Sequence, residues 1–321
     1  MADKLNITGV ILSAGVGSRI MPLSFDTPKP LLPVCNKPIM QYQIEAMSAI
    51  GIKDIIVVVS YLKEKIIEYF SDGRWLNVNI RYIEQKKTLG IAHAVGQLEN
   101  HVSGPFLLFL GDIFIVYRDL NKIIETFYKN GSATVLVVKK EDDPEYIKRN
   151  FAIHLNPDGT VKRVIEKPRY IINNLKGCGI YLFDLPIFDA IRRTPRTALR
   201  DEYEITNAIQ ILIEDGYPVH IADIVEWDMN ITVPEDLLKC NLVWLKKILA
   251  TNIIGSNVKL PAGTRVVNSV IGNNVRISQP ISICDSVILS GESIEEKKDI
   301  KNSLISHRTV INGGKDVTRQ I

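Results

Sequence analysis

The sequence predicts an α/β protein with a Rossmann-like, mixed but mostly parallel sheet, followed by a short β-solenoid. Two observations support this fold class. Over the first two thirds of the chain, short apolar runs rich in β-branched residues alternate with segments of helical period. After residue 250 the helical period ends, and short aliphatic motifs recur instead. With 321 residues, the chain has room for a larger domain over 1–250 and a smaller one over 251–321.

Apolar runs predict the strands of the first domain, and several of them are apolar on both faces. These strands are expected at 8–13, 54–60, 79–84, 106–112 and 133–138. Between them, residues 38–51 and 62–73 have the period of amphipathic helices. Alternation of strand and helix gives a parallel sheet covered on both faces, with ligands at the carboxyl ends of its strands.

From about residue 150 to 250 the pattern changes to paired strands and longer helices. Residues 151–167 predict a hairpin, because a Pro-Asp-Gly turn separates two alternating runs. Further strands are expected at 177–184 and 219–224, and helices at 204–216 and 234–249. We expect this region to complete the first domain.

Residues 252–313 predict a stacked β-solenoid. Isolated aliphatic residues recur about every six positions, and an Ile-Gly-x-Asn motif occurs at both 254–257 and 271–274. The charged segment SGESIEEKKDIKN (290–302) is expected to interrupt the pattern. The solenoid should therefore have few coils.

Composition excludes several classes of protein. The formal charge of +3 comes from 39 basic and 36 acidic residues without a block of like charges, so nucleic acid is not an expected partner. No apolar run approaches the roughly 20 residues that cross a membrane, and none resembles an export signal. The four cysteines lie far apart, as in a protein with reduced thiols rather than a zinc site or disulfide scaffold. We expect a cytoplasmic protein.

A glycine-rich loop, SAGVGSR (13–19), follows the first strand and could hold phosphate through its backbone amides. It fits neither of two common phosphate-binding motifs. Ile20 stands where the dinucleotide motif has its third glycine, and Arg19 follows Gly17-Ser18 where the Walker motif needs Gly-Lys-Ser/Thr. By itself the loop is equally well explained as a tight turn.

Two cations near this loop favour a phosphate site. Arg19 lies at its end, and Lys29 stands between Pro28 and Pro30, which restrict the backbone on both sides. Flexible surface lysines seldom have such neighbours. We therefore expect Arg19 and Lys29 to bind phosphate.

Oxygen-bearing side chains further along the chain are candidates for a metal site. Asp112 follows an apolar strand directly after Gly111, where it could hold magnesium or simply stabilise a turn. Asp228 and Asn230 are two residues apart, so both would point the same way in extended backbone.

Glu166 and Lys167 form a charged pair that precedes a proline at a predicted strand end.

These motifs together resemble the sugar-nucleotide pyrophosphorylases, the nucleotidyltransferases that join a sugar 1-phosphate to a nucleoside triphosphate. The opening signature of that family is matched by AGVGSR (14–19), PL (22–23) and PKPLLP (28–33), and later motifs follow in family order. The resemblance covers nearly the whole chain. It implies a nucleotidyltransferase catalytic domain over 1–250 and a left-handed, hexapeptide-like β-helix over 251–321.

Residues 81–95, followed by FLLFLGD (106–112), most resemble the glucose-1-phosphate thymidylyltransferases with a solenoid tail. The resemblance implies roles for individual positions. Nucleotide contacts are implied for Ala14, Gly15, Gly17, Ser18, Gln85 and Gly90, the last two with the pyrimidine. Sugar contacts are implied for Glu166, Lys167 and Gly177, with residues 201–209 forming a helix start nearby. Catalytic contacts with phosphate are implied for Arg19, Lys29 and Lys167, and Mg²⁺ ligands for Asp112 and Asn230, with Asp228 beside them.

The chain departs from the family pattern at three places. Gly111-Asp112-Ile113 replaces the frequent Gly-Asp-Asn, and Phe151-Ala152-Ile153 replaces Tyr-Gly-Val. The second metal ligand is usually an aspartate four residues before a proline, and that position here is Asn230. These differences leave the expected reaction class unchanged and bear on the choice of sugar.

The expected reaction converts glucose 1-phosphate and dTTP into dTDP-glucose and pyrophosphate. UTP-dependent uridylyl transfer and guanylyl transfer to mannose 1-phosphate are the alternatives within the fold. Outside it, a non-catalytic regulatory or scaffold relative remains open. A dinucleotide-dependent oxidoreductase is disfavoured, because no acidic residue ends the second strand. The tail is expected to serve assembly into a homo-oligomer, since it is short for an acyltransferase.

Overall fold

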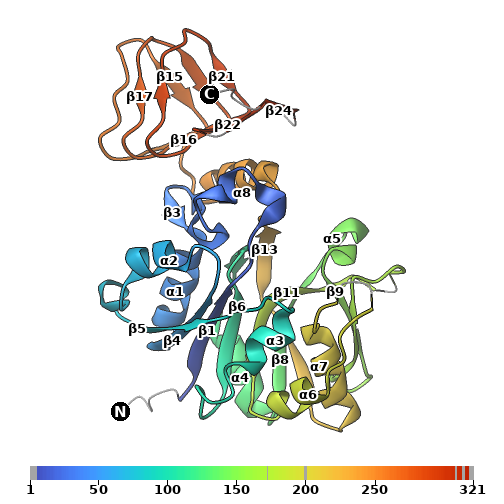
Figure 1. The fold of residues 1–321 in the computed structure, drawn as a ribbon. Helices are drawn as coiled ribbons and strands as arrows, with labels where there is room; N and C mark the ends of the chain where they lie inside the picture. The colour runs from blue at the N-terminus through green and yellow to red at the C-terminus, as the bar shows by residue number, and fades with distance from the viewer. Residues whose placement is uncertain (1–5, 172, 199–200, 308, 313–314, 318–321) are drawn as a thin grey trace. The chain divides into compact units, whose positions relative to one another are not determined.

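A computed structural model describes residues 6–171, 173–198, 201–307, 309–312 and 315–317, and it confirms the α/β class (Figure 1). The chain forms two compact units that interleave along the sequence. We call Met1–Gly15 with Gln43–Asp228 the sheet unit, and Val16–Tyr42 with Met229–Ile321 the solenoid unit. The domain boundary at residue 250 stays a prediction.

The sheet unit contains a mixed sheet with nine strands in the described part of the chain. Its backbone order is β10-β9-β11-β6-β1-β4-β5, and β8 joins β11 to β12. Strands β6, β1, β4 and β5 run parallel to one another, and β12 runs parallel to β8. Strand β11 runs antiparallel to β6, β8 and β9. The strands are β1 (Thr8–Ser13), β4 (Asp54–Val59), β5 (Asn79–Glu84), β6 (Phe106–Leu110), β8 (Thr134–Lys140), β9 (Phe151–Leu155), β10 (Val161–Glu166), β11 (Leu175–Phe183) and β12 (Val219–Asp223).

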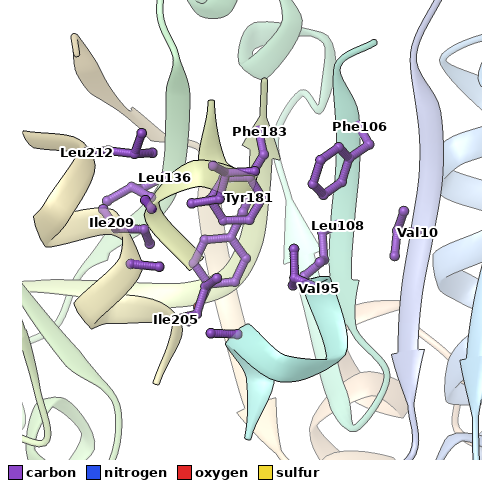
Figure 2. Close-up of a cluster of buried hydrophobic side chains, with 14 of the residues drawn as sticks. Val10, Val95, Phe106, Leu108, Leu136, Tyr181, Phe183, Ile205, Ile209 and Leu212 are labelled. Atoms are coloured by element: carbon purple, nitrogen blue, oxygen red, sulfur yellow. The ribbon is translucent and has the colours of Figure 1, made fainter. Parts of the chain in front are cut away.

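Burial on both faces explains the continuous apolar runs. Every residue of β4 after Asp54 is buried, although successive side chains point to opposite faces. Figure 2 shows part of the core, where side chains from the sheet meet those of two helices. The rings of Phe151, Tyr181 and Phe183 stack in series within it. The mixed sheet predicted from the sequence is therefore confirmed.

Eight α-helices lie in the described part of the chain, and those predicted from helical period are present. Ile205, Ile209 and Leu212 are all buried, so α7 packs one face on the core (Figure 2). The helices are α1 (Ile39–Ala49), α2 (Lys63–Phe70), α3 (Ile91–Gly96), α4 (Asn121–Lys129), α5 (Pro144–Lys148), α6 (Ile187–Arg193), α7 (Ile205–Glu214) and α8 (Pro234–Lys247). None of the described helices is long and apolar enough to span a bilayer.

The strand predicted over 106–112 is shorter than expected. It ends at Leu110, and Gly111 and Asp112 form a turn into β7 (Ile113–Tyr117), which pairs with β13 (Val225–Asn230). The hairpin predicted over 151–167 is confirmed, since β9 and β10 pair antiparallel across the Pro-Asp-Gly turn. Asp112 therefore lies in a tight turn rather than on a strand.

The solenoid unit stacks its short strands in parallel ladders. Equivalent residues are 17 positions apart: the Ser269 Oγ accepts from the Ser286 N–H at 3.1 Å, and the Ser286 Oγ accepts from the Ser303 N–H at 3.1 Å. The aliphatic spacing of about six residues thus corresponds to the side faces of one coil. The parallel strands are β14 (Asn252–Ile254), β15 (Arg265–Val267), β16 (Ser269–Ile271), β17 (Arg276–Ile277), β18 (Ser282–Cys284), β19 (Val287–Ile288), β20 (Ser293–Ile294), β21 (Ile300–Lys301) and β22 (Ser303–Ser306).

The interruption predicted over 290–302 is wrong. Strand β20 pairs with β17, and β21 pairs with β18, both in the same 17-residue register. Ile294 and Ile300 are buried in the solenoid core, so two aliphatic residues are enough to keep the charged segment in the coil. The ladder ends in antiparallel β23 (Thr309–Asn312) and β24 (Lys315–Val317).

The loop after the first strand belongs to the solenoid unit. It contains η1 (Ser18–Ile20), η2 (Leu23–Phe25), η3 (Lys29–Leu31), β2 (Pro33–Val34) and β3 (Lys37–Pro38), while η4 (Arg74–Leu76) lies in the sheet unit. The Cys35 N–H donates to Asn241 Oδ1 at 2.7 Å, and Asn36 Nδ2 donates to the Ile271 carbonyl at 2.8 Å. These bonds anchor the loop on α8 and on the first coil.

Candidate active site

The glycine-rich loop begins where β1 ends. Ala14 is buried, whereas Gly15 is exposed and would have open space around a side chain. Gly17 has φ +69°, and a Cβ there would lie 2.8 Å from Lys29 Cγ. Position 17 therefore requires glycine for two reasons: its backbone is left-handed, and Lys29 approaches it too closely for a side chain.

Lys29 is held by its backbone and by its stem. Pro28 is extended before it, η3 begins at Lys29 itself, and the residue is only 8% exposed. The aliphatic stem of Lys29 packs on Gly17. The Gly17 carbonyl accepts hydrogen bonds from Ser24 Oγ at 2.7 Å and from the Ile20 N–H at 3.1 Å. The structure thus brings Gly17 and Lys29 together within the solenoid unit. Ser18 and Arg19 are exposed, where an anion can reach them.

Gln43, which belongs to none of the sequence motifs, holds the turn that carries Asp112. The buried Gln43 Nε2 donates to the Leu110 carbonyl at 2.8 Å and to the Ile113 carbonyl at 3.0 Å. Gly111 donates its N–H to the Leu12 carbonyl at 2.9 Å. The turn is fixed from both sides, so its carboxylate is in a defined place. A polar residue on the buried face of α1 was the available signal.

The segment predicted to contact the base is attached to two other parts of the sheet unit. The Gln85 N–H donates to the Val59 carbonyl at 2.8 Å, at the end of β4. Gly90 has φ +105°, and a Cβ there would lie 2.5 Å from the Tyr203 carbonyl oxygen. Tyr203 in turn donates to the Leu89 carbonyl at 2.8 Å and accepts from the Ala92 N–H at 3.0 Å. Gly90 therefore has a backbone that only glycine fits.

The residues predicted to contact the sugar lie together at the end of β10. Thr206 Oγ1, in the first turn of α7, donates to Glu166 Oε2 at 3.3 Å. Lys167 follows with φ +42°, its N–H donates to the Asn150 carbonyl at 2.8 Å, and its Nζ lies 4.0 Å from Glu166 Oε1. The structure thus brings Glu166, Lys167 and the start of α7 together. Their contact with a sugar stays a prediction.

Gly177 lies under an aromatic ring. A Cβ at this position would overlap the ring of Phe151, which is buried and stacks on Tyr181 at 6.0 Å. Phe151 also lies opposite Glu166 in the β9–β10 pair. One of the departures from the family pattern, Phe151, therefore occupies the space that a side chain at 177 would need.

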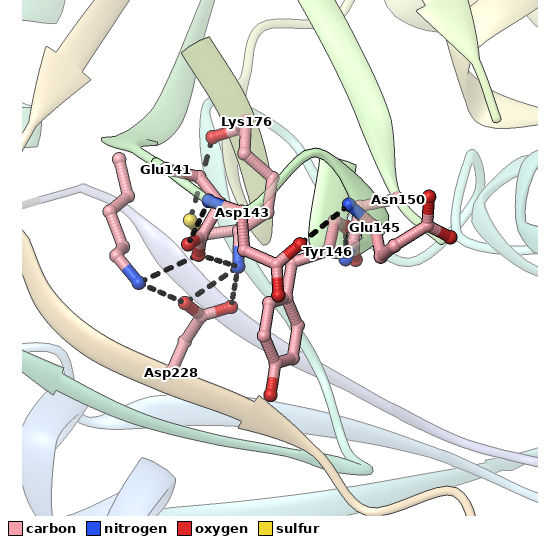
Figure 3. Close-up of polar contacts among 9 residues, drawn as sticks. Glu141, Asp143, Glu145, Tyr146, Asn150, Lys176 and Asp228 are labelled. Carbon is pink, nitrogen blue, oxygen red and sulfur yellow. Dashed lines mark hydrogen bonds and ion pairs between the residues drawn. The ribbon is translucent and has the colours of Figure 1, made fainter. Parts of the chain in front are cut away.

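The buried Asp228 and Lys176 form a network of four charges with Lys139 and Glu141, which are partly buried (Figure 3). Lys176 Nζ donates to both Asp228 oxygens, at 2.8 and 2.7 Å, and lies 3.6 Å from Glu141 Oε2. Lys139, directly opposite Lys176 on β8, binds Glu141 at 2.9 Å and lies 3.6 Å from Asp228. The two acids lie between two lysines that would otherwise repel each other. Sequence reasoning missed Lys139, Glu141 and Lys176, because their charges give no local signal.

The pKa values within this network follow its geometry. Burial raises the pKa of Glu141, but hydrogen bonds from Lys139 and the Asp143 N–H and the lysine charges outweigh it, so the net shift is downward. Burial lowers the pKa of Lys139, and the opposing carboxylates produce a net rise. Glu141 and Lys139 therefore each favour the charged form that the ion pair requires.

Oxygen donors are available for a magnesium ion. Asp112 offers a carboxylate and Asn230 an amide oxygen, both of which suit this hard cation. Asp112 belongs to the sheet unit and Asn230 to the solenoid unit. Asp228 uses both its oxygens on Lys176. Across the described residues, no three His, Cys, Asp or Glu side chains gather as a metal cluster. Magnesium in phosphate sites commonly takes only one or two protein ligands, and a carboxylate or an amide oxygen can each serve as one.

Comparison with known proteins gives matches over both parts of the chain. Residues 8–239 match the family model described as nucleotidyl transferase, and residues 246–320 match the one described as GlmU-like, C-terminal hexapeptide. A solved UDP-glucose pyrophosphorylase complexed with UDP-glucose has a TM-score of 0.67 at 20% identity, covering 75% of this chain and 99% of that one. That likeness supports the fold.

Three curated proteins illustrate the similarity in sequence. The low-salt glycan biosynthesis nucleotidyltransferase Agl11 of Haloferax volcanii is 35% identical over 74% of this chain and 66% of its own length. The UTP–glucose-1-phosphate uridylyltransferase AglF of the same organism is 34% identical over 71% of this chain and 92% of its length. A glucose-1-phosphate thymidylyltransferase of Streptomyces antibioticus is 32% identical over 71% and 66%. About a third of Agl11 and of the Streptomyces enzyme thus lies outside the match. The chain belongs to the nucleotidyl transferase family and carries a GlmU-like hexapeptide, left-handed β-helix region at its C-terminal end.

Proposed function

We propose that this protein transfers the nucleotidyl group of dTTP to glucose 1-phosphate, forming dTDP-glucose and pyrophosphate. Beyond family membership, the observation that supports it most is the packing of the Lys29 stem on Gly17 in the glycine-rich loop. UTP is the second candidate, favoured by the match over 92% of AglF, which is named a uridylyltransferase.

Two polyanions must meet in this reaction, so the site needs cations and amide groups where negative charge gathers. In the proposed mechanism a phosphate oxygen of glucose 1-phosphate attacks the α-phosphorus in line. The bond from that phosphorus to the bridging oxygen breaks, and pyrophosphate leaves with the electron pair. No covalent enzyme intermediate forms.

Each cation has a separate place in this scheme. The amides of residues 14–18 and the Arg19 guanidinium bind the triphosphate and the leaving pyrophosphate. Lys29 neutralises charge at the α-phosphate, and Lys167 orients the attacking phosphate. Asp112 and Asn230 would hold a magnesium ion, which when bound neutralises phosphate charge.

Recognition of the base and sugar is assigned to the sheet unit. Gln85 and Gly90 contact the pyrimidine. Glu166, which accepts a hydrogen bond from Thr206, binds sugar hydroxyls. Gly177, which is buried beside Phe151, is the third residue assigned to the sugar.

The solenoid is proposed to serve assembly into a homo-oligomer in the cytoplasm rather than acyl transfer. The 321-residue chain has a mass of 36.1 kDa, so light scattering should return a multiple of that value. A mass of one chain over the micromolar range would contradict the assembly role.

A substrate panel tests the proposed function. Full-length protein and Mg²⁺ are mixed with dTTP, UTP, GTP or CTP and with the 1-phosphates of glucose, N-acetylglucosamine or mannose, and pyrophosphate release is measured. The proposal predicts the highest kcat/KM for dTTP with glucose 1-phosphate. Release that is fastest with GTP and mannose 1-phosphate would contradict it.

A further inference from the structure

The side chain of Gln85 is held by a histidine. Gln85 is only 3% exposed, and its Nε2 lies 3.0 Å from Nδ1 of His93 on α3. The Nε2 of Gln97 lies 3.4 Å from the same ring atom. Amide nitrogens are donors, so two donors converge on Nδ1. With both amide nitrogens as donors, Nδ1 is the acceptor and the ring proton lies on Nε2.

The surroundings of the ring favour this neutral form. Its face lies 6.3 Å from the ring of Tyr203, at an interplanar angle of 23°, and Arg196 lies 5.7 Å from that same tyrosine ring. Burial lowers the pKa of His93, and the charge of Lys87 lowers it further. The backbone of Tyr203 is fixed by its bonds to Leu89 and Ala92. The histidine therefore has a defined position, and its surroundings favour the neutral ring.

A neutral acceptor at this place fixes which way the Gln85 amide faces. Turning the amide over would place Oε1 against Nδ1, two acceptors with no proton between them. Such a contact loses a hydrogen bond and leaves a buried polar atom unpaired, which is unfavourable. The amide then has one orientation, with Oε1 and its second N–H left for a ligand.

We propose that His93 is a positioning residue that makes the site select uracil or thymine over cytosine by fixing the orientation of the Gln85 carboxamide. The inference rests on the proposed function, in which Gln85 contacts the pyrimidine. Uracil and thymine present an N3–H donor beside the O4 acceptor, whereas cytosine presents an N3 acceptor beside the N4 donor. A freely turning amide complements both patterns. A fixed amide complements one of them.

The test is the ratio of kcat/KM for UTP to that for CTP with glucose 1-phosphate. His93→Leu removes the acceptor, and the ratio should fall about tenfold, the loss of one oriented hydrogen bond. His93→Asn keeps an acceptor near the place of Nδ1 and should retain most of the ratio. The matched control is His220→Leu, which removes another half-buried histidine whose Nδ1 lies 2.9 Å from Ser132 Oγ, and it should leave the ratio unchanged.

A second readout needs no activity. Nitrogen-15 NMR of the full-length wild-type protein should show His93 with a proton on Nε2 and none on Nδ1 near neutral pH, with the signal assigned by its loss in His93→Asn. A proton on Nδ1 would overturn the inference, as would a His93→Leu enzyme with an unchanged ratio. If the wild-type enzyme uses neither UTP nor dTTP, the proposed function itself fails. The two failures are thereby distinguished.

Discussion

Two buried lysines, Lys29 in the solenoid unit and Lys176 in the sheet unit, show how differently one residue type can be used. Lys29 is 8% exposed and is fixed by flanking prolines and by its stem on Gly17. Lys176 is 1% exposed, and its ammonium group binds both oxygens of Asp228. Burial is therefore a poor guide to what a lysine does. We infer that Lys176 stabilises the fold and that Lys29 meets the substrate.

The largest expected effect is on stability, through Lys176. Lys176→Met removes the two hydrogen bonds to the buried Asp228 carboxylate. Lys139 Nζ, 3.6 Å from Asp228 Oδ1, then faces that carboxylate without Lys176. Breaking a buried pair in this way typically lowers the free energy of unfolding by 3–5 kcal/mol. Urea denaturation measures the change.

A double variant provides the control for that prediction. Lys176→Met combined with Asp228→Leu removes both charges and leaves the Lys139–Glu141 pair at 2.9 Å in place. Replacement of a whole buried pair by apolar residues is often close to neutral. A double variant as unstable as Lys176→Met alone would show that the charges are not what stabilises this region.

The next effect is on catalysis, through Lys29. Lys29→Met keeps the stem on Gly17 and removes the charge, so kcat/KM should fall by about 10²–10³, as for other single groups that stabilise a transition state. Pyrophosphate release measures it, with Lys122→Met on the exposed face of α4 as the control. Near-wild-type turnover in Lys29→Met would remove this lysine from the mechanism and end the contrast with Lys176.

A smaller effect is expected at Gly17, which links backbone and charge. Gly17→Ala places a Cβ at φ +69° and 2.8 Å from Lys29 Cγ, so it should lower the free energy of unfolding by about 1–2 kcal/mol. It should also displace Lys29 and lower kcat/KM. Gly15→Ala, which meets open space, is the matched control for stability. Equal stability of the two variants would contradict the close packing at Gly17.

The smallest effect is the acid response of the charge network. Because the folded pKa of Glu141 is below its ordinary value of 4.5, its contribution to stability is present above pH 4.5 and is lost as pH falls through the folded pKa. The free energy of unfolding of wild-type protein should therefore decrease more steeply below pH 4.5 than that of Glu141→Gln. Parallel slopes would exclude a contribution from this carboxylate.

The sequence predicted the parts of this molecule that have a local pattern. Continuous apolar runs located the parallel strands, and two prolines indicated the restricted backbone at Lys29. The charge network was not predictable, because Asp228 is 52 residues from Lys176. Gln43 supports a turn about 70 residues away. The helical period of its own segment predicted that Gln43 is buried, but not which groups it contacts. The 290–302 segment was misjudged because its charges obscured Ile294 and Ile300, which are 17 residues after Ile277 and Ile283.

We propose above all that this protein transfers a nucleotidyl group from a nucleoside triphosphate to the phosphate of a sugar 1-phosphate. The most direct test incubates the wild-type protein and Lys29→Met in parallel with Mg²⁺, glucose 1-phosphate and either dTTP or UTP, and quantifies both products. The account predicts that wild-type protein forms nucleotide sugar and pyrophosphate in equal amounts, and that Lys29→Met forms about 10²–10³ times less of both per unit time. Absence of pyrophosphate with both nucleotides, or unequal amounts of the two products, would contradict it.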